Sequence, residues 1–158
     1  MNPAFTKVSE LGEKLLKQKM KFQGIRIFQL NIGNFKKGAA MTIPGIGIFV
    51  GKGMQHDTEL LRHEFGHVLQ CRKWGFWFFW RSIASDSLKS ALNQKRKYAP
   101  HMHTWTEWSA NWLAYQYFDK PGDWNFSRFP ITPAGESRVS KPKFAASNQI
   151  FIEEWLEA

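Results

Sequence analysis

The alternation of apolar and polar residues predicts strands in the first third of the chain and helices after them. Residues 25–32 and 41–50 are rich in β-branched and aromatic side chains, which is typical of strands. Pro44, Gly45 and Gly47 are expected to bend the second stretch or to form a bulge in it. Short extended stretches followed by helical segments predict an α+β fold.

Helical spacing of apolar residues recurs along the rest of the chain. It is clearest over residues 58–73, where Asp57 or Thr58 offers an N-cap, and over residues 103–118. We expect further helices over residues 8–21, 82–98 and 147–157, and an irregular, proline-rich surface segment over residues 120–143.

The segment from Trp74 to Trp80 (WGFWFFW) is aromatic at every position except Gly75. It can pack in the interior, form the wall of a cleft or touch a membrane surface. Interior packing is the interpretation that we favour. Peripheral membrane contact through residues 74–80 stays open.

Length and charge narrow the classes of protein to consider. The 158 residues suit a single domain over residues 1–158. Lysine and arginine number 22 against 13 acidic residues, a net charge of +9 that permits binding to nucleic acid, anionic lipid or acidic substrates. The one dense basic group, residues 95–97, is typical of a solvated surface, and no known nucleic-acid-binding pattern accompanies it. We therefore expect no nucleic-acid partner.

The single cysteine, Cys71, excludes an internal disulfide and a cysteine-based zinc site. Residues 1–21 lack the apolar core of a secretion signal, and no stretch approaches the roughly 18 apolar residues that a membrane-spanning helix needs. We expect a cytoplasmic protein, with peripheral membrane association left open. The oligomeric state stays undetermined.

His63, Glu64 and His67 form an HExxH pattern inside the predicted helix 58–73. Residues four apart lie on one helical face, so both imidazoles can reach a common metal ion. Glu64 lies beside the first histidine, where its carboxylate can reach a metal-bound water without occupying the metal. The pattern indicates a zinc site of the kind that supports hydrolysis.

A catalytic zinc ion usually has three protein ligands and one open position, so the chain must supply a third ligand. The longer pattern HExxHxxGxxH is excluded, because Gln70 and Lys73 stand where it needs glycine and histidine. Glu107 is the strongest candidate. Ala110 and Ala114 share its helical face, and such small residues let two helices approach closely.

Two alternatives to Glu107 as third ligand remain open. Thr104 to Glu107 matches a capping box, in which the glutamate caps its own helix and binds no metal. His101 and His103 form an H-x-H pair in a segment expected to be extended, and either could be the third ligand. Asn111, one turn after Glu107, is expected to accept the free N–H of a ligand imidazole.

The HEFGH motif at residues 63–67, together with Glu107 in the form Glu-x-x-Ala-Asn, resembles small bacterial zinc metallopeptidases of the gluzincin type. The resemblance covers residues 56–118. It implies a small zincin-like fold, in which a short β-sheet packs on the active-site helix and a second helix brings the glutamate. The chain is much shorter than the thermolysin-like enzymes, and Asn111 stands where their glutamate helix carries an acidic residue.

The resemblance further implies one zinc ion (Zn2+) per chain, held by His63, His67 and Glu107. Glu64 would be the base that takes a proton from the metal-bound water during hydrolysis of a peptide or protein substrate. Related enzymes place a histidine or tyrosine donor near the oxyanion, and the candidates here are Tyr98, His101, His103 and Tyr115.

Two other functions compete with a zinc peptidase. The same ligands could serve a non-catalytic, zinc-stabilised interaction module, in which His101 or His103 closes the fourth coordination position. Alternatively, the chain could be a basic membrane- or nucleic-acid-binding protein in which the HExxH pattern is incidental.

Overall fold

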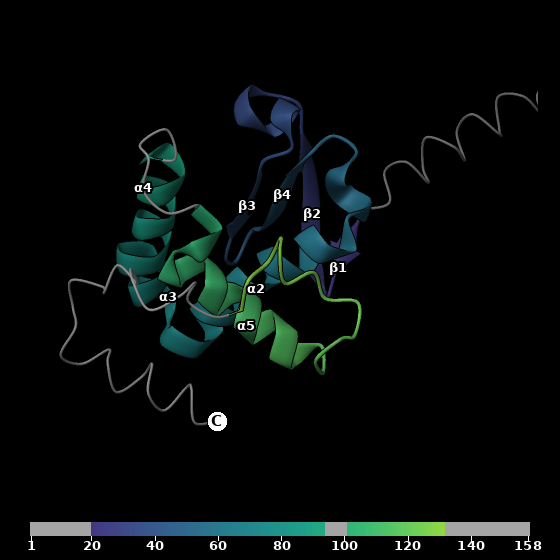
Figure 1. The fold of residues 1–158 in the computed structure, drawn as a ribbon. Coiled ribbons are helices and arrows are strands. Elements are labelled where there is room, and N and C mark those ends of the chain that lie inside the picture. The colour runs from purple at the N-terminus through teal and green to yellow at the C-terminus, as the bar shows by residue number, and fades with distance from the viewer. Residues whose placement is uncertain (1–19, 94–100, 132–158) are drawn as a thin grey trace, which may run out of the picture. The chain divides into compact units, whose positions relative to one another are not determined.

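The computed structural model describes residues 20–93 and 101–131 (Figure 1). The contacts of the chain separate it into two compact units, one up to His56 and one from Asp57 onward. Each unit is treated by itself. The expectation of a single domain over residues 1–158 stays a prediction.

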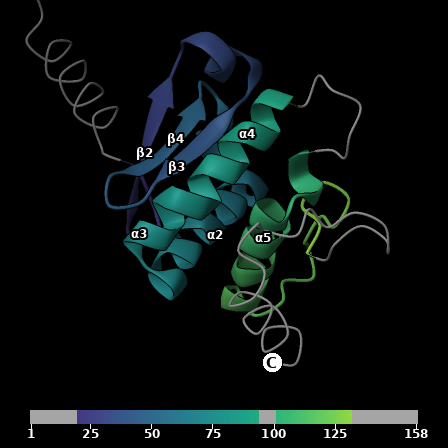
Figure 2. The ribbon, with the colours of Figure 1, turned by 90° about the vertical axis from the view of Figure 1, so that its left-hand side faces the viewer.

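The first unit is a four-stranded mixed sheet with the strand order β1-β2-β4-β3 (Figures 1 and 2). Strand β2 pairs antiparallel with β1 and parallel with β4, and β4 pairs antiparallel with β3. Short 3-10 turns follow β2 and β4. The elements are β1 (Lys21–Phe22), β2 (Ile25–Leu30), η1 (Gly33–Lys37), β3 (Ala40–Ile43), β4 (Gly47–Gly51) and η2 (Met54–His56).

The predicted extended stretch over residues 41–50 is a hairpin, so the expectation of one bent or bulged strand was wrong. The N–H of Ile46 donates to the carbonyl of Ile43 at 3.0 Å, which closes a turn around Pro44 and Gly45. Gly45 has a φ of +86°. Proline followed by glycine at positive φ is the signature of a type II turn, which reverses the chain where a bulge would only bend it.

Several predictions fall on residues that lie outside the described ranges. They are most of the helix 8–21, the basic group 95–97 and the terminal helix 147–157. The last two residues of the first of these helices, Met20 and Lys21, are described, and the prediction was wrong there. Lys21 belongs to strand β1, because it pairs with Arg26 across a tight turn.

The second unit is helical, and with the sheet it confirms the general α+β class. Its two long helices, α2 and α5, match the predictions for residues 58–73 and 103–118 closely. His101–His103 is a 3-10 turn, so the expected extended segment there was wrong. The elements are α2 (Thr58–Trp74), α3 (Phe76–Phe78), the π-helical η3 (Phe79–Ala84), α4 (Ser85–Asn93), η4 (His101–His103) and α5 (Trp105–Tyr117).

Helix α2 begins and ends at residues that satisfy its terminal backbone groups. The Asp57 carboxylate accepts a hydrogen bond from the N–H of Leu60 at 3.0 Å, as an N-cap should. At the other end Gly75 adopts a φ of +88° and donates its N–H to the carbonyl of Cys71. Glycine reaches this conformation without strain, so the helix stops there.

Helices α2 and α5 lie side by side, as both views show (Figures 1 and 2). They approach closely at Gly66, where a Cβ atom would collide with the carbonyl oxygen of Ala110. Ala110 and Ala114 are fully buried. The neighbour of the bare backbone at Gly66 is therefore the backbone of α5.

Residues 118–131 form neither helix nor strand, in agreement with the irregular segment expected there. Ion pairs tie this segment to α2: Asp123 lies 2.9 Å from Arg62, and Arg128 lies 2.7 Å from Asp57. Exposed pairs of this kind contribute little to stability, because water and salt screen them. Burial of Phe129, which is 4 % exposed, adds the larger apolar contribution.

The segment 74–80 is only partly buried, so the favoured interpretation of interior packing holds for the smaller part of it. Phe79 is 3 % exposed and joins a core cluster with Ile83, Trp105 and Trp108. In contrast, Phe76 and Trp77 are exposed. No helix within the described residues is both long and apolar enough to cross a bilayer.

We predict that Gly66→Ala separates α2 from α5. The new methyl group collides with the Ala110 carbonyl, and overpacking of this kind costs about 1–3 kcal/mol. That cost exceeds the roughly 1 kcal/mol that alanine gains over glycine inside a helix. Urea unfolding should therefore show a net loss of stability.

Gly122→Ala is the matched control, because a Cβ atom there meets nothing within 4 Å. It should unfold at the same urea concentration as the wild type. An equally stable Gly66→Ala variant would show that the two helices do not depend on this contact.

Candidate metal centre

Helices α2 and α5 each contribute side chains to the candidate site. His63, Glu64 and His67 come from the middle of α2, and Glu107 comes from the first turn of α5. All four are buried, with exposed fractions of 4, 4, 7 and 1 %. Four ionisable side chains rarely share an interior unless they are paired or bind an ion, so the cluster marks a candidate functional site.

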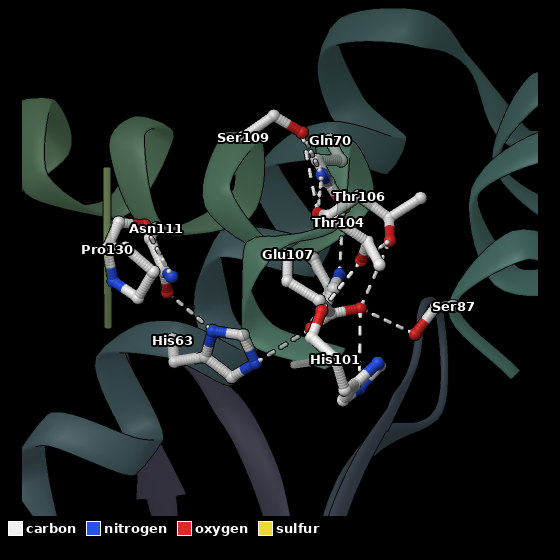
Figure 3. A network of polar contacts seen from close by, with 11 residues as sticks. His63, Gln70, Ser87, His101, Thr104, Thr106, Glu107, Ser109, Asn111 and Pro130 are labelled. Carbon is white, nitrogen blue, oxygen red and sulfur yellow. Dashed lines mark hydrogen bonds and ion pairs between the residues drawn. The ribbon is translucent and has the colours of Figure 1, made fainter. Parts of the chain in front are cut away.

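One carboxylate oxygen of Glu107 lies between the two imidazoles, and Figure 3 shows its contact with His63. Glu107 Oε2 is 3.3 Å from His63 Nε2 and 3.4 Å from His67 Nε2. The metal-binding atoms of these three residues all lie within 4.8 Å of one another. The structure thus brings together the three residues that the sequence selected as ligands.

These distances suit a tetrahedral ion. Zinc binds nitrogen and oxygen ligands at about 2.0–2.2 Å, which separates neighbouring ligand atoms by about 3.3–3.6 Å. The separations of 3.3 and 3.4 Å fall in that range. They also suit an ion pair between a protonated imidazole and a carboxylate, so the residues fit zinc without requiring it.

The other nitrogen of His63 is held by a side chain of α5. His63 Nδ1 donates to the amide oxygen of Asn111 at 2.6 Å, the contact expected for Asn111. The Asn111 amide group in turn donates to the carbonyl of Pro130 at 2.9 Å, which orients its oxygen toward the imidazole. Phe129 stacks on the His63 ring, with centroids 5.2 Å apart. The imidazole is therefore held with Nε2 facing Glu107.

The other nitrogen of His67 is held by Gln70, a residue that the sequence analysis did not select. His67 Nδ1 donates to Gln70 Oε1 at 2.8 Å. The Gln70 amide nitrogen donates to the carbonyl of Thr106 at 2.6 Å and to Ser109 Oγ at 2.7 Å. The i, i+3 spacing of His67 and Gln70 on one helix was the available signal, since such residues are neighbours.

The second carboxylate oxygen of Glu107 is also engaged. Glu107 Oε1 accepts hydrogen bonds from Ser87 Oγ at 2.6 Å and from Thr106 Oγ1 at 3.2 Å, and His101 Nε2 lies 3.7 Å away (Figure 3). Ser87 stands on α4, and no spacing in the sequence pointed to it. The carboxylate is thus oriented from α4 and α5 together.

The capping-box alternative for Glu107 was wrong. Thr104 is the N-cap residue of α5, but its side chain caps no backbone N–H of the helix. The backbone N–H of Thr104, which the box would assign to Glu107, donates to the carbonyl of His101 at 3.0 Å. The carboxylate points instead to the imidazoles, because these are the charged partners within reach.

The charges of the site are strongly coupled. Burial alone would raise the pKa of Glu107, but His67 and His63 outweigh it and hold that pKa well below its usual range. Burial alone would lower the pKa of His67, but Glu107 outweighs it and raises the pKa to about 9. Without a metal His67 carries a proton at neutral pH. A metal ion would have to displace that proton.

His101 lies at the edge of the cluster, with a side chain that is 20 % exposed. Burial lowers the pKa of His101, Glu107 opposes this effect, and the neighbouring α2 histidines add to the lowering. Of the other expected oxyanion donors, Tyr115 packs its ring on Trp124 and Phe126. Tyr98 and the side chain of His103 lie outside the described part of the chain.

Comparison with known proteins found no match: no family model fits the chain, and it is not significantly similar to a curated protein or a solved structure. The assignment of a function therefore depends on the geometry of the site.

We predict that Asn111→Ala weakens zinc binding about 10- to 100-fold, the usual effect of removing a group that orients a metal-bound histidine. His63 would lose the oxygen that holds its Nδ1. Competition with a chromophoric chelator measures the affinity. Gln116→Ala, an exposed amide on the same helix, is the control and should bind as the wild type does. Equal affinities of the two variants would remove Asn111 from this role.

Proposed function

We propose that the chain is a zinc-dependent metallopeptidase with a small zincin-like catalytic unit. One observation carries the proposal. Two imidazoles and one carboxylate converge at ligand spacing, and both imidazoles are oriented through their other nitrogen. Oriented histidines are typical of metal sites, where the second nitrogen sets the tautomer and the direction of the ring.

His63, His67 and Glu107 would hold the zinc ion. Two neutral imidazoles and one carboxylate leave a zinc site with a net charge of +1. When bound, zinc supplies Lewis acidity and lowers the pKa of water toward about 7. The amides of Asn111 and Gln70 would keep the two imidazoles in place as the ion enters.

Glu64 would act as the general base. It follows the first ligand on α2 and is 4 % exposed, so its carboxylate would work in a site largely closed to solvent. It would take the proton from the water that attacks the peptide carbonyl and pass it to the departing amine. His101, beside Glu107, would donate a hydrogen bond to the oxyanion.

The decisive variant is Glu64→Gln, which keeps the size of the side chain and removes the base. Purified wild type should contain about one zinc ion per chain and cleave a fluorogenic peptide library. Glu64→Gln should keep the zinc and lose at least about a hundredfold in kcat, the usual share of a general base. Glu59→Gln makes the same change on α2 outside the site and should retain full activity.

Two outcomes would contradict the proposal. A wild-type protein that holds no zinc after incubation with the metal would show that the cluster is an ion pair. A Glu64→Gln variant as active as the wild type would exclude Glu64 as the base.

His101 favours a second candidate, a zinc-stabilised module without catalysis. Its Nε2 lies 3.7 Å from Glu107 Oε1, close enough to supply a fourth ligand after a small adjustment. Four protein ligands close a zinc site to water and leave it a structural role.

The variant His101→Ala separates the two candidates. In a structural site it should weaken zinc binding and lower the thermal midpoint of the zinc-loaded protein, because a ligand is lost. In a catalytic site it should leave the zinc content unchanged and lower kcat. Metal analysis, thermal unfolding and peptide cleavage on one preparation decide between them.

A further inference from the structure

The segment that links α2 to α4 has an apolar residue on nearly every side. Phe79 and Ile83 are 3 and 0 % exposed and anchor it in the core of the helical unit. Phe76, Trp77 and Trp80 are 53, 83 and 38 % exposed. A helical segment needs only one apolar face to join a core, so folding does not account for the second face.

The outward aromatic residues form one patch. The rings of Phe76 and Trp77 lie 5.7 Å apart, and those of Phe76 and Trp80 lie 6.1 Å apart, both edge to face. Their spacing of i, i+1 and i+4 places them on one side of the helical segment. Contiguous exposed aromatic surface of this kind marks an interaction site, whereas single exposed apolar residues are ordinary.

The charged residues that flank the patch in the sequence from residue 72 to residue 81 all have one sign. Arg72 and Lys73 precede it and Arg81 follows it, and all three are exposed. The sequence contains no acidic residue between Glu64 and Asp86. Asp86 itself lies 3.6 Å from Lys89, with which it forms an ion pair. The partner of the patch should therefore carry negative charge.

We propose that Phe76, Trp77 and Trp80, with Arg72, Lys73 and Arg81, form a docking surface for an anionic lipid bilayer. Indole and phenyl rings beside arginine and lysine suit the boundary of headgroups and acyl chains, where one end of the contact is apolar and the other is charged. The rings enter this boundary and the cations contact the lipid phosphates. This surface does not depend on the proposed peptidase activity, so either proposal can fail alone.

The test is co-sedimentation of the full chain with vesicles of phosphatidylcholine, with and without phosphatidylglycerol. The wild type should bind the anionic vesicles and bind the neutral ones much more weakly. The double variant Phe76→Ser/Trp77→Ser should bind anionic vesicles at least about tenfold more weakly, since two apolar side chains leave the interface. Arg81→Gln should bind about fivefold more weakly, as expected for one cation near a charged membrane.

Matched controls separate this surface from the general positive charge of the chain. Phe126→Ser removes a ring with nearly the same exposure as Phe76, and Lys37→Gln removes an exposed cation from the sheet unit. Both should bind as the wild type does. Thermal unfolding should show unchanged midpoints. If the double variant is unstable, Trp77→Ser decides the question, because that side chain is 83 % exposed.

Three results would overturn the proposal. The wild type could fail to bind anionic vesicles, or it could bind them no better than the double variant and the controls do. Light scattering could also show a wild-type dimer that the double variant turns into a monomer. That last result would assign the patch to contact between two copies of the chain.

Discussion

The contact between Gly66 of α2 and Ala110 of α5 is the constraint on which the candidate site depends. The Ala110 carbonyl occupies the place of a side chain at Gly66, so the two backbones meet directly. Glu107 stands one turn before Ala110, and His63 and His67 stand on either side of Gly66. Helices separated by an ordinary side chain would lie about 8–10 Å apart and would hold the carboxylate farther from the imidazoles.

This close packing buries charge, which requires compensation within the site. A carboxylate at 1 % exposure is costly in isolation, because water no longer solvates it. Glu107 is stabilised by the two imidazoles, by Ser87 and by Thr106. A proton shared with His67 balances its charge when no metal is present. A divalent cation would do the same more strongly, so a site of this composition can exchange protons for a metal ion.

One imidazole is oriented by a residue nearby in the sequence, and the other is oriented by a residue far away in it. Gln70 is one turn from His67 on the same helix. Asn111 reaches His63 from α5 and is itself held by the carbonyl of Pro130. The irregular segment 118–131 therefore has a role beyond covering the surface. Its Pro130 carbonyl orients the Asn111 amide group, and its Phe129 ring stacks on His63.

The local features of this protein can be predicted from its sequence alone: the helix 58–73, its cap at Asp57, and the common face of His63 and His67. These follow from helical periodicity and from short-range hydrogen bonds, which neighbouring residues decide among themselves. Counting zinc ligands also selected Glu107, and the structure brings it together with His63 and His67. The capping box remained open beside it, because a local pattern cannot reveal where a side chain points.

The partners that each side chain meets became known from the tertiary contacts. The tertiary structure placed Ser87 of α4 on Glu107 and turned the stretch around Pro44 into a hairpin, and it left Trp77 outside while Phe79 entered the core. An aromatic residue looks the same in the sequence whether its side chain is buried or exposed in the fold. The difference arises from which side of the helix the rest of the chain covers, and that depends on contacts between residues far apart in the sequence.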